Sequence, residues 1–149
     1  MTLKNAGNSD AIALLQDATD QFFMCHWNER AIGSKPPSWS EPWRFSGTLH
    51  NHDKQGVYAF LRGPTVIYLG VGASRGKAGY EGHGLGARVQ KYIRHNGGGE
   101  YRPHDERMLG ADCVVTIGFE KGCGYLAPAL ESYLISRIPT PHNIQKPGA

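Results

Sequence analysis

The chain has 149 residues, a hydrophobic share of 40%, a charged share of 19% and a formal net charge of +3. This length and composition fit one globular domain with a single core, and they exclude a wholly disordered chain or two full domains. No apolar run reaches the length of a membrane span and no signal-peptide pattern opens the chain, so we expect a soluble, cytoplasmic protein without a membrane partner.

The positive charge is concentrated in the second part of the chain. Residues 1–55 hold 5 Lys and Arg against 6 Asp and Glu, whereas residues 56–149 hold 11 against 7. Within this part, residues 75–94 hold five Lys and Arg against Glu81 alone, which suits binding to a phosphate backbone, although a solvated helix face is an equal alternative. The three cysteines form no CxxC pair, which favours reduced thiols over a disulfide framework or a zinc cluster.

Residues 1–55 are predicted to form an extension that packs on the core. Ser9 or Asp10 is a plausible N-cap for a first helix, because apolar residues follow at mostly helical spacing. Residues 27–55 hold all three tryptophans and the run "SKPPSWSEPW", whose prolines exclude a regular helix. We expect this part to be ordered but irregular, and extra core is the favoured role over a dimer surface or a recognition element.

A β-hairpin is predicted next. The runs "GVYAFLR" (56–62) and "VIYLGVG" (66–72) are rich in β-forming residues, and the "GPT" between them is a turn sequence. Antiparallel pairing of the two runs brings Tyr58 and Tyr68 onto neighbouring strands, on one face if the register allows.

The remaining elements follow in order along the chain. Residues 72–86 are glycine-rich and are expected to form a loop, followed from Leu85 by a helix of about three turns that places Arg88 and Tyr92 on one face. The run 96–110 breaks that helix. The stretch "DCVVTIGF" (112–119) has the pattern of a buried strand, and "YLAPALESYLISRI" (125–138) that of a helix with Pro128 near its start.

Glu131 lies in the middle of the apolar stripe of this last predicted helix. Its neighbours in that direction are Ala127, Leu134, Ile135 and Ile138, so the carboxylate is expected to point toward the core. A buried carboxylate needs an arginine, a metal ion or hydrogen-bond donors beside it. A purely structural ion pair, for example with Arg88, is the alternative to a functional role.

Taken together, these residues resemble the GIY-YIG nuclease family. "GVY" at 56–58 corresponds to its first motif and "YLG" at 68–70 to its second, and Arg88, Tyr92, Glu131 and Asn143 follow in the order of the family's later motifs. The match covers residues 56–143, while residues 1–55 match nothing in the family. The glycine-rich stretch between Tyr68 and Arg88 is longer than in compact members.

The resemblance implies an α/β fold of the α+β type, with a small antiparallel three-stranded sheet flanked by helices in residues 56–149. It implies hydrolysis of DNA phosphodiester bonds, with RNA not excluded and a homodimer possible. Glu131 would hold Mg²⁺ or Mn²⁺, Arg88 would bind the scissile phosphate and Tyr58 would be the candidate general base. The implied catalytic residues are Tyr58, Tyr68, Arg88, Tyr92, Glu131 and Asn143, and the candidate nucleic-acid-binding residues are Arg75, Lys77, His83, Lys91 and Arg94.

Two other classes of function compete with this interpretation. One is a nucleic-acid-binding module that keeps the nuclease fold and lacks activity. The other is a nucleotide- or phosphate-binding protein, because the glycines of "IYLGVGASRG" follow a strand as they do in phosphate-binding loops. The second is weaker, since no complete GxGxxG is present and no acidic residue stands about twenty positions on for a ribose.

Overall fold

The computed structural model describes residues 3–73 and 84–143. Its centre is an antiparallel three-stranded sheet made of β1 (Gln55–Arg62), β2 (Thr65–Gly72) and β5 (Cys113–Phe119), in the order β2-β1-β5. The three-stranded sheet and the predicted hairpin are therefore confirmed. A separate two-stranded ribbon, which the sequence did not predict, pairs β3 (Ile93–His95) with β4 (Tyr101–Pro103).

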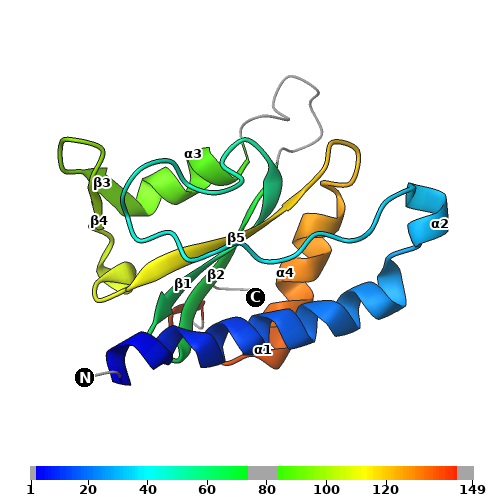
Figure 1. Ribbon diagram of the computed structural model, residues 1–149, viewed down its shortest axis with the longest axis horizontal. Helices are drawn as coiled ribbons and strands as arrows, with labels where there is room; N and C mark the ends of the chain where they lie inside the picture. Colours follow the sequence, from blue (N-terminus) through cyan, green and yellow to red (C-terminus); the bar gives the residue numbers. More distant parts are fainter. Residues whose placement is uncertain (1–2, 74–83, 144–149) are drawn as a thin grey trace.

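Helices cover the two faces of the sheet differently (Figure 1). The long α1 (Leu3–His26) and α4 (Leu126–Arg137) lie against each other and against one face. On the other side lie the short α3 (Leu85–Val89), continued by the 3₁₀ helix η2 (Gln90–Tyr92), and the β3–β4 ribbon. No helix in the described ranges combines the length and the apolar character needed to cross a membrane.

Successive side chains along each strand point to opposite faces of the sheet, and this divides the hydrophobic core into two clusters. From β1, Val57, Ala59 and Leu61 join α1 and α4 in the first cluster, while Tyr58 and Phe60 belong to the second. The second cluster is rich in aromatic rings and lies under α3 and the ribbon. Tyr58 and Tyr68 thus lie on the face opposite α1 and α4, and Tyr92 packs against this second cluster.

The first helix begins earlier than predicted. It starts at Leu3, so Ser9 and Asp10 lie inside α1 and the predicted cap is wrong. Contacts with the hairpin turn explain the difference: a Cβ on Gly7 would lie 3.0 Å from the Cα of Gly63, and Asn8 Nδ2 donates a 3.0 Å hydrogen bond to the Gly63 carbonyl. Tertiary packing, which propensity does not encode, therefore extends the helix.

The tryptophan-rich segment adds core on both sides of the sheet. It begins with the short α2 (Glu29–Ile32) and then runs along the outer edge of β5, where the backbones of Trp43 and Val114 exchange hydrogen bonds of 2.8 and 2.9 Å. Trp39 is buried in the first cluster and Trp43 in the second. These two side chains thus act as extra core, as the sequence favoured.

The helix expected from Leu85 is shorter than three full α-helical turns. Five α-helical residues are followed by a 3₁₀ turn, and the chain then turns into β3 at Ile93. Gly97, Gly98 and Gly99 all have positive φ angles of 91°, 61° and 80°, which only glycine adopts readily, and they form the tip that returns the chain into β4. The "NGGGE" run therefore makes a hairpin and does not simply end a helix.

Candidate active site

Three tyrosine hydroxyls converge on the aromatic face of the sheet. Tyr58 Oη, from β1, donates a 3.2 Å hydrogen bond to Tyr92 Oη at the end of η2, and Tyr68 Oη, from β2, lies 3.4 Å from the same oxygen. The ring centroids of Tyr58 and Tyr68 are 6.3 Å apart and nearly parallel. Tyr58 and Tyr68 are buried, whereas Tyr92 is half-buried, so the cluster reaches solvent on the η2 side.

A β-bulge places Tyr68 on this face. Near the turn, Leu61 pairs with Val66, but beyond it Phe60 pairs with Tyr68, so Ile67 is the extra residue. Without the bulge Tyr68 would stand opposite Ala59 and point toward α4. Because side chains alternate with a period of two, this one-residue shift brings Tyr58 and Tyr68 together.

The glycine opposite Tyr58 gives its ring room. Gly70 is the cross-strand partner of Tyr58, and a Cβ at position 70 would overlap the Cζ and the hydroxyl of that tyrosine. Gly72 is constrained in a similar way, since a Cβ there would lie 2.6 Å from the Gly84 carbonyl oxygen. Close packing thus accounts for two of the glycines that suggested a phosphate-binding loop, which weakens that interpretation further.

Two arginines flank the tyrosines. Arg88, in α3, is half-buried and close enough to Tyr58 for its charge to oppose the rise in the pKa of that phenol. Arg107, in the 3₁₀ helix η3 (Glu106–Met108), lies over the rings of Tyr68 and Tyr92, with its Cζ 5.2 and 5.6 Å from their centroids. Arg107 was not among the site residues predicted from the sequence.

Asp105 holds Arg107 in place. Its two carboxylate oxygens accept hydrogen bonds of 3.1 Å each from Nε and Nη2 of Arg107, and Oδ1 also accepts one of 2.9 Å from the Arg107 backbone amide. The pairing holds the pKa of Asp105 below its usual value and raises that of Arg107. An Asp cap followed by a basic residue two positions later is the one local signal for this arrangement.

Glu131 lies on α4, as predicted, and its side chain is half-buried with Oε2 enclosed. Its negative charge acts on Tyr68, where it contributes to the raised pKa of that phenol. Glu131 thus acts on Tyr68 through its charge, although α4 lies against the face of the sheet opposite the tyrosine rings. Within the described ranges no three His, Cys, Asp or Glu side chains gather into a multi-ligand metal site, so a cation here would rely on few protein ligands.

Asn143 fastens the C-terminal part of the chain to the edge of the sheet. Its side chain is buried, Oδ1 accepts a 2.8 Å hydrogen bond from the Leu69 amide, and Nδ2 donates one of 2.9 Å to the Leu69 carbonyl. Since β2 is an edge strand, this amide takes the place of a neighbouring strand. The contact fits a positioning role next to Tyr68.

The predicted nucleic-acid-binding residues divide into two groups. Lys91, in the middle of η2, and Arg94, in β3, are described and exposed. Arg75, Lys77 and His83 lie outside the described residues.

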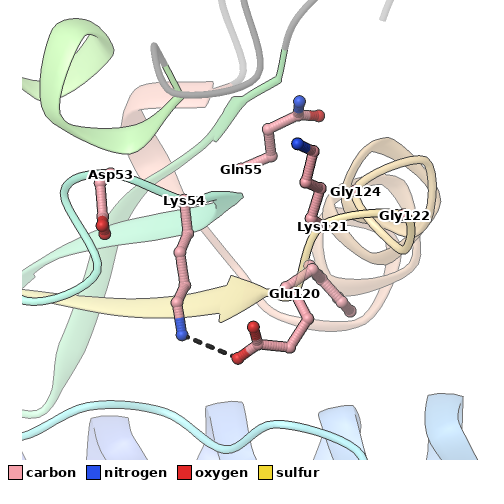
Figure 2. A pocket seen from close by; sticks show the side chains of 8 residues that line it. Asp53, Lys54, Gln55, Glu120, Lys121, Gly122 and Gly124 are labelled. Atoms are coloured by element: carbon pink, nitrogen blue, oxygen red, sulfur yellow. Dashed lines mark hydrogen bonds and ion pairs between the residues drawn. The ribbon is translucent and has the colours of Figure 1, made fainter. Parts of the chain in front are cut away.

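One concave region lies away from the three tyrosines. A hollow of about 270 Å³ between the start of β1 and the end of β5 is crossed by the 3.0 Å Lys54–Glu120 ion pair, and Figure 2 shows Lys121 extending beside Gln55 at its other end. Its charged residues are Asp53, Lys54, Glu120 and Lys121, whose formal charges cancel. This hollow therefore does not favour an anionic ligand.

Burial sets the proton affinity of the tyrosine cluster. Loss of solvation raises the pKa of Tyr58 far above the usual value for a phenol, and the charge and hydrogen bond of Tyr92 add to the rise. Burial, followed by the hydrogen bond and charge of Tyr92, likewise raises the pKa of Tyr68. Both phenols therefore keep their protons to higher pH than an ordinary tyrosine does.

These shifts predict that the free energy of unfolding falls at alkaline pH. Burial raises the pKa of the Cys113 thiol from 9.0 to about 11, and the pKa of Tyr58 is raised above 10.0. The unfolded chain therefore loses these protons first, and stability declines by about 1.4 kcal/mol per pH unit for each group, above pH 9 for Cys113 and above pH 10 for Tyr58. Urea unfolding between pH 8 and 11 measures this decline.

A substitution at Tyr58 tests whether this phenol causes part of the decline in the free energy of unfolding. Tyr58→Phe should make the decline above pH 10 less steep, while Tyr68, whose pKa burial also raises, keeps part of it. An equal slope in the parent and Tyr58→Phe would contradict the assignment.

Comparisons of the chain with models of known protein families, with curated proteins and with solved structures found no match.

Proposed function

We propose that the protein is a metal-dependent endonuclease of the GIY-YIG type that hydrolyses DNA phosphodiester bonds. The observation that carries the proposal is the convergence of the hydroxyls of Tyr58, Tyr68 and Tyr92. Arg88, Arg107 and Glu131 act electrostatically on the same cluster. Fixed cations and a metal-binding carboxylate stabilise charge in phosphodiester hydrolysis, and hydroxyls can orient its reactants.

Arg88 is the group that binds the scissile phosphate in this proposal. A guanidinium is charged at every working pH and offers paired donors that match phosphate oxygens. It stabilises the charge that builds on those oxygens as the water attacks. The half-buried position of Arg88 strengthens that interaction, because a less polar surrounding screens charge less than bulk water does.

In this proposal the tyrosines bind the substrate and orient the reacting groups. A general base must lose its proton near the working pH, and the raised pKa of Tyr58 argues against that role for a phenol with these neighbours. We therefore assign Tyr58 the role of a protonated hydroxyl that orients the attacking water or a phosphate oxygen. Tyr92 is the half-buried member of the cluster, so in this proposal it is the first of the three tyrosines to contact the substrate.

Glu131 would hold the divalent cation. Its carboxylate is a hard oxygen ligand and is only half-buried, which fits Mg²⁺ or Mn²⁺, since Mg²⁺ retains several waters and often uses just one or two protein carboxylates. When bound, such an ion supplies positive charge for the leaving oxygen. Arg88 and the tyrosines bind and orient the reactants around it.

A nucleic-acid-binding protein without hydrolytic activity is the second candidate. It is favoured by the raised pKa values of Tyr58 and Tyr68, because these leave neither phenol as a ready base at neutral pH. Both candidates predict DNA binding, and they differ in whether the bond is cut.

A cleavage assay separates them. Supercoiled plasmid, linear duplex, single-stranded DNA and RNA are incubated with the parent protein in Mg²⁺, in Mn²⁺ and in EDTA. Cutting of a DNA substrate that requires the cation supports the nuclease, and cutting of RNA alone would correct the substrate class. DNA binding in gel-shift experiments without cutting of any substrate would favour the second candidate.

A further inference from the structure

The β3–β4 ribbon carries an unusual pair of like charges. Arg94 and Arg102 stand directly opposite each other in the ribbon register, and both are exposed. Within the part of the chain that the structure describes, neither forms an ion pair. Like charges directly across two strands destabilise a sheet, so packing and pairing give no reason for this arrangement.

The inner face of the ribbon is attached to the aromatic core, which leaves the arginines on the outer face. Ile93 is buried, and the Tyr101 ring packs on Trp43 and His95 with centroid separations of 5.6 and 5.0 Å. Arg94 and Arg102 alternate with these residues and therefore point the other way. Figure 1 shows the ribbon projecting at one end of the molecule, away from α2 at the other.

Hydrogen bonds fix the ribbon to the body. The Tyr101 amide donates to the Phe45 carbonyl at 2.7 Å, and the Gly47 amide donates to the Gly99 carbonyl at 2.9 Å. At its base, the amide of His104 donates to the Tyr92 carbonyl at 3.0 Å. The arginine pair is thus held at a set position relative to the tyrosine cluster.

The ribbon is inserted between Tyr92, a member of that cluster, and Arg107, which lies over the rings of Tyr68 and Tyr92. Tyr92 immediately precedes β3, and Arg107 follows β4 after one short turn. Two residues of strand span about 7 Å, so the backbone of Arg94 lies about that distance from the backbone of Tyr92. Exposed Lys91 adds a third positive charge at the same end. These three cations therefore lie close to Tyr92 along the chain or across the ribbon from Arg94.

We propose that the outer face of the β3–β4 ribbon is a nucleic-acid-binding surface, on which Arg94 and Arg102 hold phosphates flanking the site at the tyrosine cluster. The inference rests on the proposed function for the identity of the ligand as DNA. The inference adds to the proposed function where the DNA backbone is bound and why it is bound there. The mutual repulsion of the two guanidiniums is relieved when an anionic backbone lies across them. The surface contributes affinity without sequence preference, because its contacts are to phosphates.

The salt dependence of DNA binding tests the proposal. Affinity for a fluorescent duplex is measured in EDTA between 50 and 300 mM salt, for the parent and for Arg94→Ala/Arg102→Ala. Each phosphate contact contributes about 0.9 to the slope of log K against log salt, so the slope should become shallower by about 1.8 in the double variant. Arg94→Lys/Arg102→Lys should retain most of the slope, since a lysine also binds phosphate.

A matched control removes the same charge elsewhere. Arg30→Ala/Lys35→Ala takes two exposed cations from α2 and the segment after it, at the end of the molecule away from the ribbon, and should leave the slope as in the parent. The melting temperature of Arg94→Ala/Arg102→Ala should equal or exceed that of the parent, because a repulsive pair is lost. A clear fall in melting temperature would show that the arginines stabilise the fold and would count against the proposal.

The outcomes separate this surface from the proposed activity. An unchanged slope in a parent that cuts DNA overturns the ribbon surface and leaves the nuclease standing. A slope that depends on the ribbon, in a parent that cuts nothing, supports the surface and counts against the nuclease. Absence of any DNA binding by the parent overturns both.

Discussion

Replacing Glu131 by glutamine is expected to lower the rate of metal-dependent DNA cleavage by about 10²- to 10³-fold. Glutamine keeps the size and polarity of the side chain but removes the negative charge that holds a hard divalent cation. Among the described residues, no group of three or more His, Cys, Asp and Glu side chains could hold the cation in its place. The measurement is the initial rate of plasmid nicking in saturating Mg²⁺ or Mn²⁺.

Two controls separate loss of chemistry from loss of structure. Glu29→Gln removes one exposed carboxylate from α2 and should cut at the parent rate. Glu131→Gln should bind duplex DNA in EDTA as tightly as the parent, because the lost group binds metal and not phosphate. Cleavage at the parent rate by well-folded Glu131→Gln would contradict the assignment of Glu131 as the metal ligand.

The elements that sequence predicts correctly have strong local signals. Two runs of β-forming residues around a Gly-Pro turn predict β1 and β2 to within one residue at each end, and the apolar stripe with an early Pro128 predicts α4. Periodicity and turn chemistry act over a few residues, so a single sequence contains enough information for these features. The expectation that Tyr58, Tyr68 and Tyr92 share one region came from the family resemblance and not from such local signals.

The parts that sequence misses depend on contacts between distant residues. The bulge at Ile67 decides which face Tyr68 occupies, yet nothing in "TVIYLG" distinguishes a regular strand from a bulged one. Arg107 reaches the cluster only because the ribbon returns the chain to Tyr92. The glycine triplet at 97–99 was a usable signal for that hairpin, since three successive glycines suit a tip with positive φ.

Gly70→Ala is expected to lower the free energy of unfolding by about 3 kcal/mol. A methyl group at this position would overlap the Cζ and hydroxyl of Tyr58, so the ring must move or the strands must separate. The ring has little freedom to move, because Phe60 and Tyr92 pack beside it at centroid distances of 6.0 and 5.9 Å and its exposed fraction is 1%. Urea unfolding at pH 7 measures the loss.

A double-mutant cycle with Tyr58→Ala tests the cause directly. Once the ring is absent the new methyl group has space, so Gly70→Ala should cost much less in the Tyr58→Ala background than in the parent. Additive losses would mean that the substitution acts through the strand backbone and not through the ring. Parent-like stability and cleavage by Gly70→Ala would contradict the placement of Tyr58 over this glycine, and with it the geometry on which the three-tyrosine site depends.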